Sequence, residues 1–267
     1  MFKTSDGTQI EIVENIVTGH RSLIVLWPCM TGNTAMYRLP VKEFNNAGIS
    51  VIQFNPRGHS RSGGQFDLSQ CLADLSEYIN SLNIGDTPLW LIGHSAGASA
   101  VLKYGTLYGT AARYILVSPV LDSIESYRYL YENGNHSEPN AIIASLTSDS
   151  GFMASLLENS RWMNREEWEM NSYREKIDAI SGEVLIGSFM QKLFIEGFNA
   201  FDDLKLHRMS TSMFLPLNDS WFPMAVTTGL ASQNGIKTET ITEASDHYFT
   251  GAWKYVWRRV LEMMCIN

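Results

Sequence analysis

The chain has 267 residues, of which 45% are hydrophobic and 18% are charged. This composition supports a sizeable core and excludes a wholly disordered chain. Its 20 basic and 28 acidic residues give a net charge of −8, the opposite of what a broad nucleic-acid-binding surface requires. The length fits one large α/β domain or two small ones.

The cysteines and the N-terminal segment indicate the cellular compartment in which we expect the protein. Cys29, Cys71 and Cys265 are far apart and form no CxxC pair, so neither a disulfide framework nor a zinc site is indicated. The N-terminus lacks the apolar segment of a signal peptide, and no apolar run approaches the roughly 18 residues that span a bilayer. We therefore expect a cytoplasmic protein with no membrane span and no nucleic-acid partner. The sequence does not indicate an oligomeric state.

The first 120 residues alternate between β-rich and helical patterns. Alternating polar and apolar residues at 8–13, after an Asp6-Gly7 turn, predict an early hairpin. Apolar and β-branched runs predict buried strands at 22–27, 49–54, 88–92 and 114–117. Helical patterns lie between these strands, at 33–46, 68–82 and 96–108.

The alternation stops near residue 122 and resumes at 212. Strands are predicted at 212–217 and 237–241, and an amphipathic helix ends the chain. Strands alternating with helices indicate a mostly parallel sheet that is covered on both faces. We therefore predict an α/β core domain formed by residues 1–122 and 208–267. Residues 123–207 are predicted to form a cap or lid over the carboxyl ends of the strands, where open α/β sheets bind ligands.

The most informative stretch is Gly93-His94-Ser95-Ala96-Gly97, which lies between a predicted buried strand and a predicted helix. A sharp turn between such elements strains the central residue and lifts its hydroxyl above the sheet, beside the positive end of the helix. Small flanking residues make that turn possible. The pattern predicts that Ser95 is a nucleophile; the alternative is a glycine-rich turn whose serine merely caps the helix.

A nucleophilic serine needs a base, and the base needs an acid to orient it. His247 follows the last predicted strand and is the expected base, with His207 in reserve. Asp219 lies just beyond the preceding strand and is the expected acid. Asp122, which follows the 114–117 strand, is the competing acid.

The oxyanion of a tetrahedral intermediate needs two aimed backbone N–H groups. We expect one from Ala96, the residue after the nucleophile. The other should come from the loop after the 22–27 strand, where Met30 is the first choice and Cys29 the second. The thiol of Cys29 is expected to be inert.

These motifs together resemble those of the α/β-hydrolase superfamily, over nearly the whole chain outside the insertion. The residues at 55–62 resemble the Asp-x-Arg-Gly-His-Gly-x-Ser loop of monoacylglycerol-lipase-like members, with Asn55 and Ser60 as departures. Pro28-Cys29 stands where many members carry His-Gly. The resemblance implies an eight-stranded, mostly parallel sheet with a helical cap inserted after the sixth strand.

The predicted function is that of a serine hydrolase that cleaves a carboxylic ester or thioester through an acyl-enzyme. Ser95, Asp219 and His247 would form the catalytic triad, and neither a cofactor nor a metal is required. The expected partner is a small acyl substrate, free or carrier-bound. An acyltransferase, a lactonase or a C–C bond hydrolase could use the same residues, and a non-catalytic ligand-binding member of the fold is a further alternative.

Overall fold

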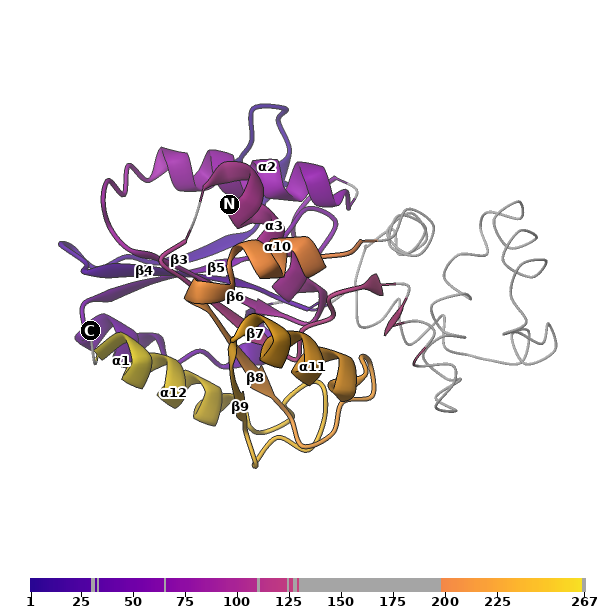
Figure 1. Cartoon of the computed structure of the whole chain (residues 1–267). Coiled ribbons are helices and arrows are strands. Elements are labelled where there is room, and N and C mark those ends of the chain that lie inside the picture. Colours follow the sequence, from indigo (N-terminus) through magenta and orange to yellow (C-terminus); the bar gives the residue numbers. More distant parts are fainter. Residues whose placement is uncertain are drawn as a thin grey trace, which may run out of the picture.

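The computed structural model describes residues 1–29, 32, 34–64, 66–109, 111–123, 125–126, 129 and 198–265. Their main feature is a seven-stranded sheet, which runs across the centre of Figure 1. Its strands, in spatial order, are β3 (Ile12–Asn15), β5 (Ile49–Phe54), β4 (Ser22–Trp27), β6 (Leu89–His94), β7 (Arg113–Val117), β8 (Thr211–Leu215) and β9 (Lys237–Thr240). Only β3 is antiparallel to its neighbour. The predicted mostly parallel sheet is confirmed.

Among the described residues, the main sheet has seven strands and not the expected eight. The predicted early hairpin forms from β1 (Phe2–Lys3) and β2 (Gln9–Ile10), but these strands pair with each other in a separate two-stranded sheet. The turn is closed locally, because the backbone N–H of Thr4 donates to the carbonyl of Thr8 at 3.0 Å. The long insertion therefore follows the fifth strand of the main sheet along the chain, among the residues described, rather than the sixth.

The helices predicted at 68–82, at 96–108 and at the end of the chain lie close to their predicted positions. The described helices are α1 (Val41–Asn46), α2 (Leu68–Ser81), α3 (Ala96–Tyr108), α10 (Phe201–Leu206), α11 (Met224–Asn234) and α12 (Trp253–Cys265). Two short 3₁₀ helices, η1 (Thr34–Tyr37) and η3 (Arg208–Ser210), accompany them. No helix in this part of the chain is long and apolar enough to cross a membrane.

One predicted helix is divided. The pattern at 33–46 predicts a continuous helix, but the structure has η1, a break, and then α1. Pro40 precedes α1 with ψ at 68°, outside the helical region. A proline lacks the N–H that a continuous helix needs, and its ring clashes with the preceding turn. The helix therefore restarts after the proline.

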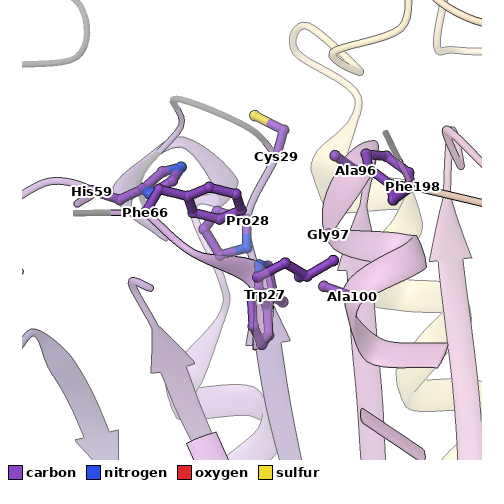
Figure 2. Close-up of a pocket in the computed structure, with 10 residues that line it drawn as sticks. Trp27, Pro28, Cys29, His59, Phe66, Ala96, Gly97, Ala100 and Phe198 are labelled. Carbon is purple, nitrogen blue, oxygen red and sulfur yellow. The ribbon is translucent and has the colours of Figure 1, made fainter. Parts of the chain in front are cut away.

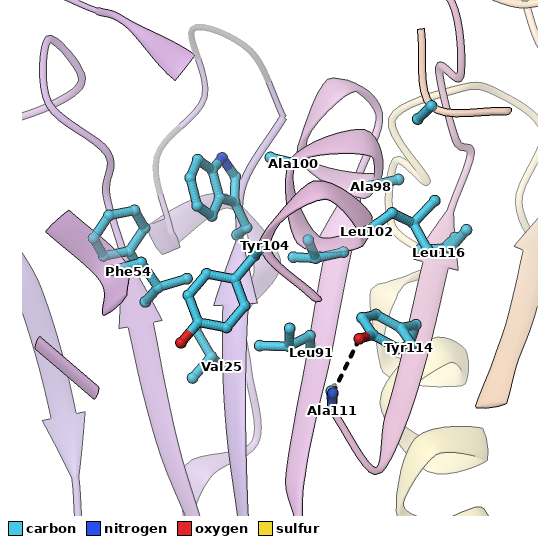
Figure 3. Close-up of a cluster of buried hydrophobic side chains, with 14 of the residues drawn as sticks. Val25, Phe54, Leu91, Ala98, Ala100, Leu102, Tyr104, Ala111, Tyr114 and Leu116 are labelled. Atoms are coloured by element: carbon cyan, nitrogen blue, oxygen red, sulfur yellow. Dashed lines mark hydrogen bonds between the residues drawn. The ribbon is translucent and has the colours of Figure 1, made fainter. Parts of the chain in front are cut away.

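Two hydrophobic cores lie on opposite faces of the sheet. Along β4, Leu23 and Val25 enter the core covered by α2, α3, α10 and α11, whereas Ile24 and Leu26 enter the core covered by α1 and α12. This alternation is why the strand reads as an unbroken apolar run. Figure 3 shows part of the first core, where side chains of α3 pack onto β4 and β6.

The chain leaves and re-enters the sheet at neighbouring points. The N–H of Ser123 donates to the carbonyl of Phe198 at 3.0 Å, and the N–H of Ala200 donates to the carbonyl of Leu121 at 2.8 Å. Most of the predicted cap, residues 130–197, lies outside the described residues. Helix α10, at the end of the predicted cap, packs against α3. The boundaries of the cap remain a prediction.

Candidate active site

Ser95 occupies the turn between β6 and α3. Its φ and ψ are 58° and −125°, a strained conformation for a residue with a side chain. The two flanking glycines allow the turn to close. A Cβ on Gly93 would lie 2.6 Å from the Cα of Ala98, and one on Gly97 would lie 2.8 Å from the carbonyl oxygen of Trp27. The strained turn expected from the sequence is therefore present.

Three side chains predicted to act together lie within hydrogen-bonding distance. The Ser95 Oγ is 2.9 Å from Nε2 of His247, and Nδ1 of the same ring is 2.9 and 3.0 Å from the two carboxylate oxygens of Asp219. All three residues are buried. Ser95 follows β6, Asp219 follows β8 and His247 follows β9. The three residues meet because parallel strands bring their carboxyl ends to one edge of the sheet.

The surroundings of Asp219 keep it ionised and fix the tautomer of His247. Burial acts to raise the pKa of this carboxyl group, but its interactions with His247 and with two backbone N–H groups together lower it. The N–H groups of Trp221 and Phe222 donate to its Oδ1 at 2.8 and 3.1 Å, so the net pKa is lowered. A carboxylate only accepts hydrogen bonds, so His247 carries its proton on Nδ1. Its Nε2 is then free to accept from Ser95.

The two reserve candidates lie in other contacts. Asp122 accepts from the N–H of Glu125 at 2.9 Å and from the side chain of Asn199 at 2.7 Å. The Nε2 of His207 is 3.1 Å from Oγ1 of Thr106. The structure therefore brings neither residue to Ser95.

The expected oxyanion donors are only partly described. Ala96 begins α3, so its N–H belongs to the first turn, where backbone donors have no partner within the helix. Met30 lies outside the described residues. The N–H of Cys29, the second choice, donates to the hydroxyl of Tyr37 at 2.6 Å and is already engaged. Burial raises the pKa of the Cys29 thiol to about 11, so this thiol is protonated near neutral pH.

A small, open pocket reaches the start of α3 beside Ser95. Figure 2 shows it between the loop after β4 and α3. Its described lining is mostly apolar and aromatic: Trp27, Pro28, Cys29, His59, Phe66, Leu68, Ala96, Gly97, Ala100 and Phe198. Burial lowers the pKa of His59 to about 4, so the described walls carry no charge near pH 7.

Two residues beside the site were given no role from the sequence. His94 and Tyr37 are fully buried, and His94 links Tyr37 to the main chain of His247. Tyr37 is 57 positions from His94, and His94 is 153 positions from His247. No local sequence pattern predicts contacts between residues so far apart in the chain.

Among the described residues, no cluster of three or more His, Cys, Asp or Glu side chains could hold a metal ion.

Comparison with known protein families identifies the group to which the chain belongs. The Hydrolase_4 family model, described as serine aminopeptidase, S33, matches residues 18–195. The chain belongs to this family, within the α/β-hydrolase superfamily. The part of this chain that the family model matches includes Ser95 and ends before Asp219 and His247.

Several solved structures are similar to this chain in fold. A carboxylesterase from Nitrososphaera gargenis has a TM-score of 0.69 at 17% identity, covering 98% of this chain and 96% of the other. An esterase from Exiguobacterium antarcticum has a TM-score of 0.66 at 15% identity, with 98% and 97% coverage. An enol-lactonase from Burkholderia xenovorans has a TM-score of 0.67 at 14% identity, with 97% and 98% coverage. At these identities the likeness concerns the fold.

A curated relative matches a shorter part of the chain. A monoacylglycerol lipase from Mycolicibacterium smegmatis is 29% identical over 116 residues. The matched segment covers 40% of this chain and 40% of the lipase.

Proposed function

We propose that the protein is a serine hydrolase that cleaves a carboxylic ester or thioester through an acyl-enzyme intermediate. The observation that carries this proposal is the hydrogen-bonded series from Ser95 through His247 to Asp219. A hydroxyl, an imidazole and a carboxylate in that order are the parts of a nucleophile, its base and an orienting acid. Membership of a hydrolase family supports the same chemistry.

In the proposed reaction, Ser95 Oγ attacks the acyl carbon while its proton moves to Nε2 of His247. Asp219 stabilises the imidazolium that forms. The proton then passes to the leaving alcohol or thiol as the acyl–oxygen or acyl–sulfur bond breaks. A water molecule attacks the acyl-enzyme by the same proton route, releasing the carboxylic acid and restoring Ser95.

The developing oxyanion is proposed to bind the backbone N–H groups of Ala96 and Met30. The engagement of the Cys29 N–H with Tyr37 favours Met30 over Cys29 as the second donor. Removing one such donor typically costs about 10²–10³ in rate.

The pocket beside Ala96 suggests the chemical character of the acyl group. Its described walls are apolar, and His59 is neutral near pH 7. Placing a carboxylate against such walls would strip away its water with no compensating charge. We therefore propose an uncharged acyl group. The matched segment of a monoacylglycerol lipase supports an ester as the bond to test first.

The first prediction concerns Ser95→Ala, which removes the nucleophile. We expect this variant to lose covalent labelling by a fluorophosphonate probe and to lose hydrolysis of p-nitrophenyl butyrate, while its circular dichroism spectrum stays unchanged. Labelling of the variant at the wild-type rate would overturn the proposal.

The uncharged acyl group predicts a second result in the same hydrolysis assay. A butyryl ester should react faster than its succinyl counterpart, which adds a carboxylate at the end of the acyl chain.

Product analysis separates hydrolysis from related reactions of the same residues. Acyl transfer to added alcohols, thiols or amines would indicate an acyltransferase, and ring opening of a lactone without cleavage of linear esters would indicate a lactonase. Tight ligand binding without any turnover would indicate a non-catalytic member of the fold.

A further inference from the structure

Three buried hydrogen bonds connect the loop after β4 to the loop that carries His247. The backbone N–H of Cys29 donates to Oη of Tyr37 at 2.6 Å. The same hydroxyl is 3.1 Å from Nδ1 of His94, and Nε2 of His94 is 2.9 Å from the carbonyl oxygen of His247. The side chains of Tyr37 and His94 therefore connect the backbone of Cys29 to the backbone of His247.

The direction of each bond follows from the groups at the two ends. The carbonyl of His247 can only accept, so Nε2 of His94 carries the proton and Nδ1 of His94 is an acceptor. The Tyr37 hydroxyl therefore donates to Nδ1 and accepts from Cys29. Every polar group in the series has a partner of the opposite kind. Burial is the main reason that the pKa of His94 is lowered to about 3, so the ring stays neutral near pH 7.

Residues of α12 pack against the side chains of Tyr37 and His94. Tyr37 and His94 are both 0% exposed. The ring of Trp253 on α12 packs 4.5 Å from the Tyr37 ring and 5.1 Å from the His94 ring, measured between centroids. Trp257, one turn further along α12, donates from Nε1 to the carbonyl of Tyr37 at 2.7 Å. Neither side chain can turn away without disturbing this packing.

We propose that Tyr37 and His94 are positioning residues that hold His247 and Cys29 in place relative to Ser95. His94 directly precedes Ser95 in the chain, so its backbone carries the nucleophile while its ring holds the main chain of the base. Tyr37 extends the same connection to Cys29, in the loop expected to supply an oxyanion donor. This inference rests on the proposed serine hydrolase function.

The positioning role predicts a specific kinetic result for Tyr37→Phe, which removes one oxygen atom. Misplacing a reacting group by 1 Å can cost about 10²-fold in rate, so we expect kcat to fall between about tenfold and that limit. The effect concerns the geometry of the reacting groups rather than the acyl pocket. KM for p-nitrophenyl butyrate should therefore remain close to that of the wild type.

A second pair of variants tests His94 independently. His94→Gln keeps one donor and one acceptor, whereas His94→Leu has similar bulk and keeps neither. We expect His94→Gln to retain more of the wild-type kcat than His94→Leu. Equal kcat values for the two variants would overturn the role of His94, even if Tyr37→Phe failed to fold.

Tyr114→Phe is the matched control. The Tyr114 hydroxyl also accepts from a backbone N–H, that of Ala111 at 3.0 Å, within the core shown in Figure 3. Tyr114→Phe loses one buried hydrogen bond at the opposite end of the sheet, whereas Tyr37→Phe loses two. The control should therefore lower the melting temperature while leaving kcat unchanged. A kcat for Tyr37→Phe equal to that of Tyr114→Phe would overturn the inference and leave the proposed function standing. Absence of Ser95-dependent labelling in the wild type would overturn both.

Discussion

At the scale of single residues, Asn55 shows how one contact explains a departure from a motif. The loop at 55–62 resembles one that begins with Asp, but this chain has an amide there. The Asn55 Nδ2 donates to Oε2 of Glu11 at 2.9 Å, and Asn55 Oδ1 accepts from the N–H of Thr34 at 3.0 Å. A carboxylate at position 55 would face the carboxylate of Glu11 in a buried place. The amide satisfies both neighbours without that repulsion.

This contact predicts that Asn55→Asp destabilises the protein. A buried hydrogen bond would be lost and two acids would compete for one site, so we expect a loss of about 1–3 kcal/mol in the free energy of unfolding. Urea denaturation measures it. The double variant Asn55→Asp with Glu11→Gln reverses the polarity of the pair and should recover part of the loss. If the double variant is no more stable than the sum of the two single changes predicts, Glu11 is not the reason for Asn55.

The residue scale also separates what could be foreseen in the site from what could not. Ser95 sits in a contiguous motif, and His247 and Asp219 follow predicted strands, so their positions could be inferred from local patterns and strand order. Tyr37 and His94 carry no such pattern. Their contacts depend on segments that meet only when β4, β6 and β9 are assembled.

At the scale of elements, the junction between β4 and α3 is set by close backbone packing. A Cβ on Gly97 would collide with the carbonyl oxygen of Pro28 and would lie 2.8 Å from that of Trp27. Both neighbours are backbone atoms at the end of β4, so they cannot turn aside as a side chain could. The glycine lets the start of α3 approach the loop that precedes the expected oxyanion donor.

Gly97→Ala should therefore push α3 away from β4. We expect a loss of about 1–3 kcal/mol in stability, the usual cost of forcing extra atoms into a packed interior, together with slower fluorophosphonate labelling. Gly229→Ala in α11 is the control, because a Cβ there meets nothing within 4 Å. That change should stabilise the helix by up to about 1 kcal/mol. Equal labelling rates for the two variants would contradict the packing argument.

At the scale of the whole molecule, buried neutral histidines make stability depend on pH. Burial lowers the pKa of His59 to about 4 and that of His94 to about 3, against 6.5 for an ordinary histidine. Between pH 6.5 and about 4 the unfolded chain therefore binds more protons than the folded chain, and the free energy of unfolding falls as pH falls. Carboxyl groups with lowered pKa, such as Asp219, contribute to acid loss only at lower pH.

We therefore expect stability to decline between pH 6.5 and 5, by about 1.4 kcal/mol per pH unit for each such histidine once its unfolded form is fully protonated. Urea denaturation at several pH values measures this slope. His59→Gln removes one titrating group. It should reduce the slope of unfolding free energy against pH by about 1.4 kcal/mol per pH unit, which corresponds to one proton. An unchanged slope in that variant would show that His59 is not held neutral by the fold.

The assembly of the sheet also explains why a large insertion is compatible with one site. Ser95 precedes the interruption, whereas Asp219 and His247 follow it, and β7 pairs with β8 across it through four residue pairs. The candidate site therefore forms only when both flanks join the same sheet. The strand count was less predictable than the strands themselves, because β1 and β2 carry a strand pattern that does not specify their partner.

The sequence by itself determined most of the elements and the position of the candidate nucleophile. Hydrophobic periodicity and the G-x-S-x-G spacing act over a few residues, so they can be read without knowledge of the fold. Only the tertiary structure decided the order of the strands, the partners of Asn55 and the connection from Cys29 through Tyr37 and His94 to His247. Those features join residues that are distant in the chain, and their energies depend on burial and hydrogen-bond geometry that exist only after the two faces of the sheet have been covered.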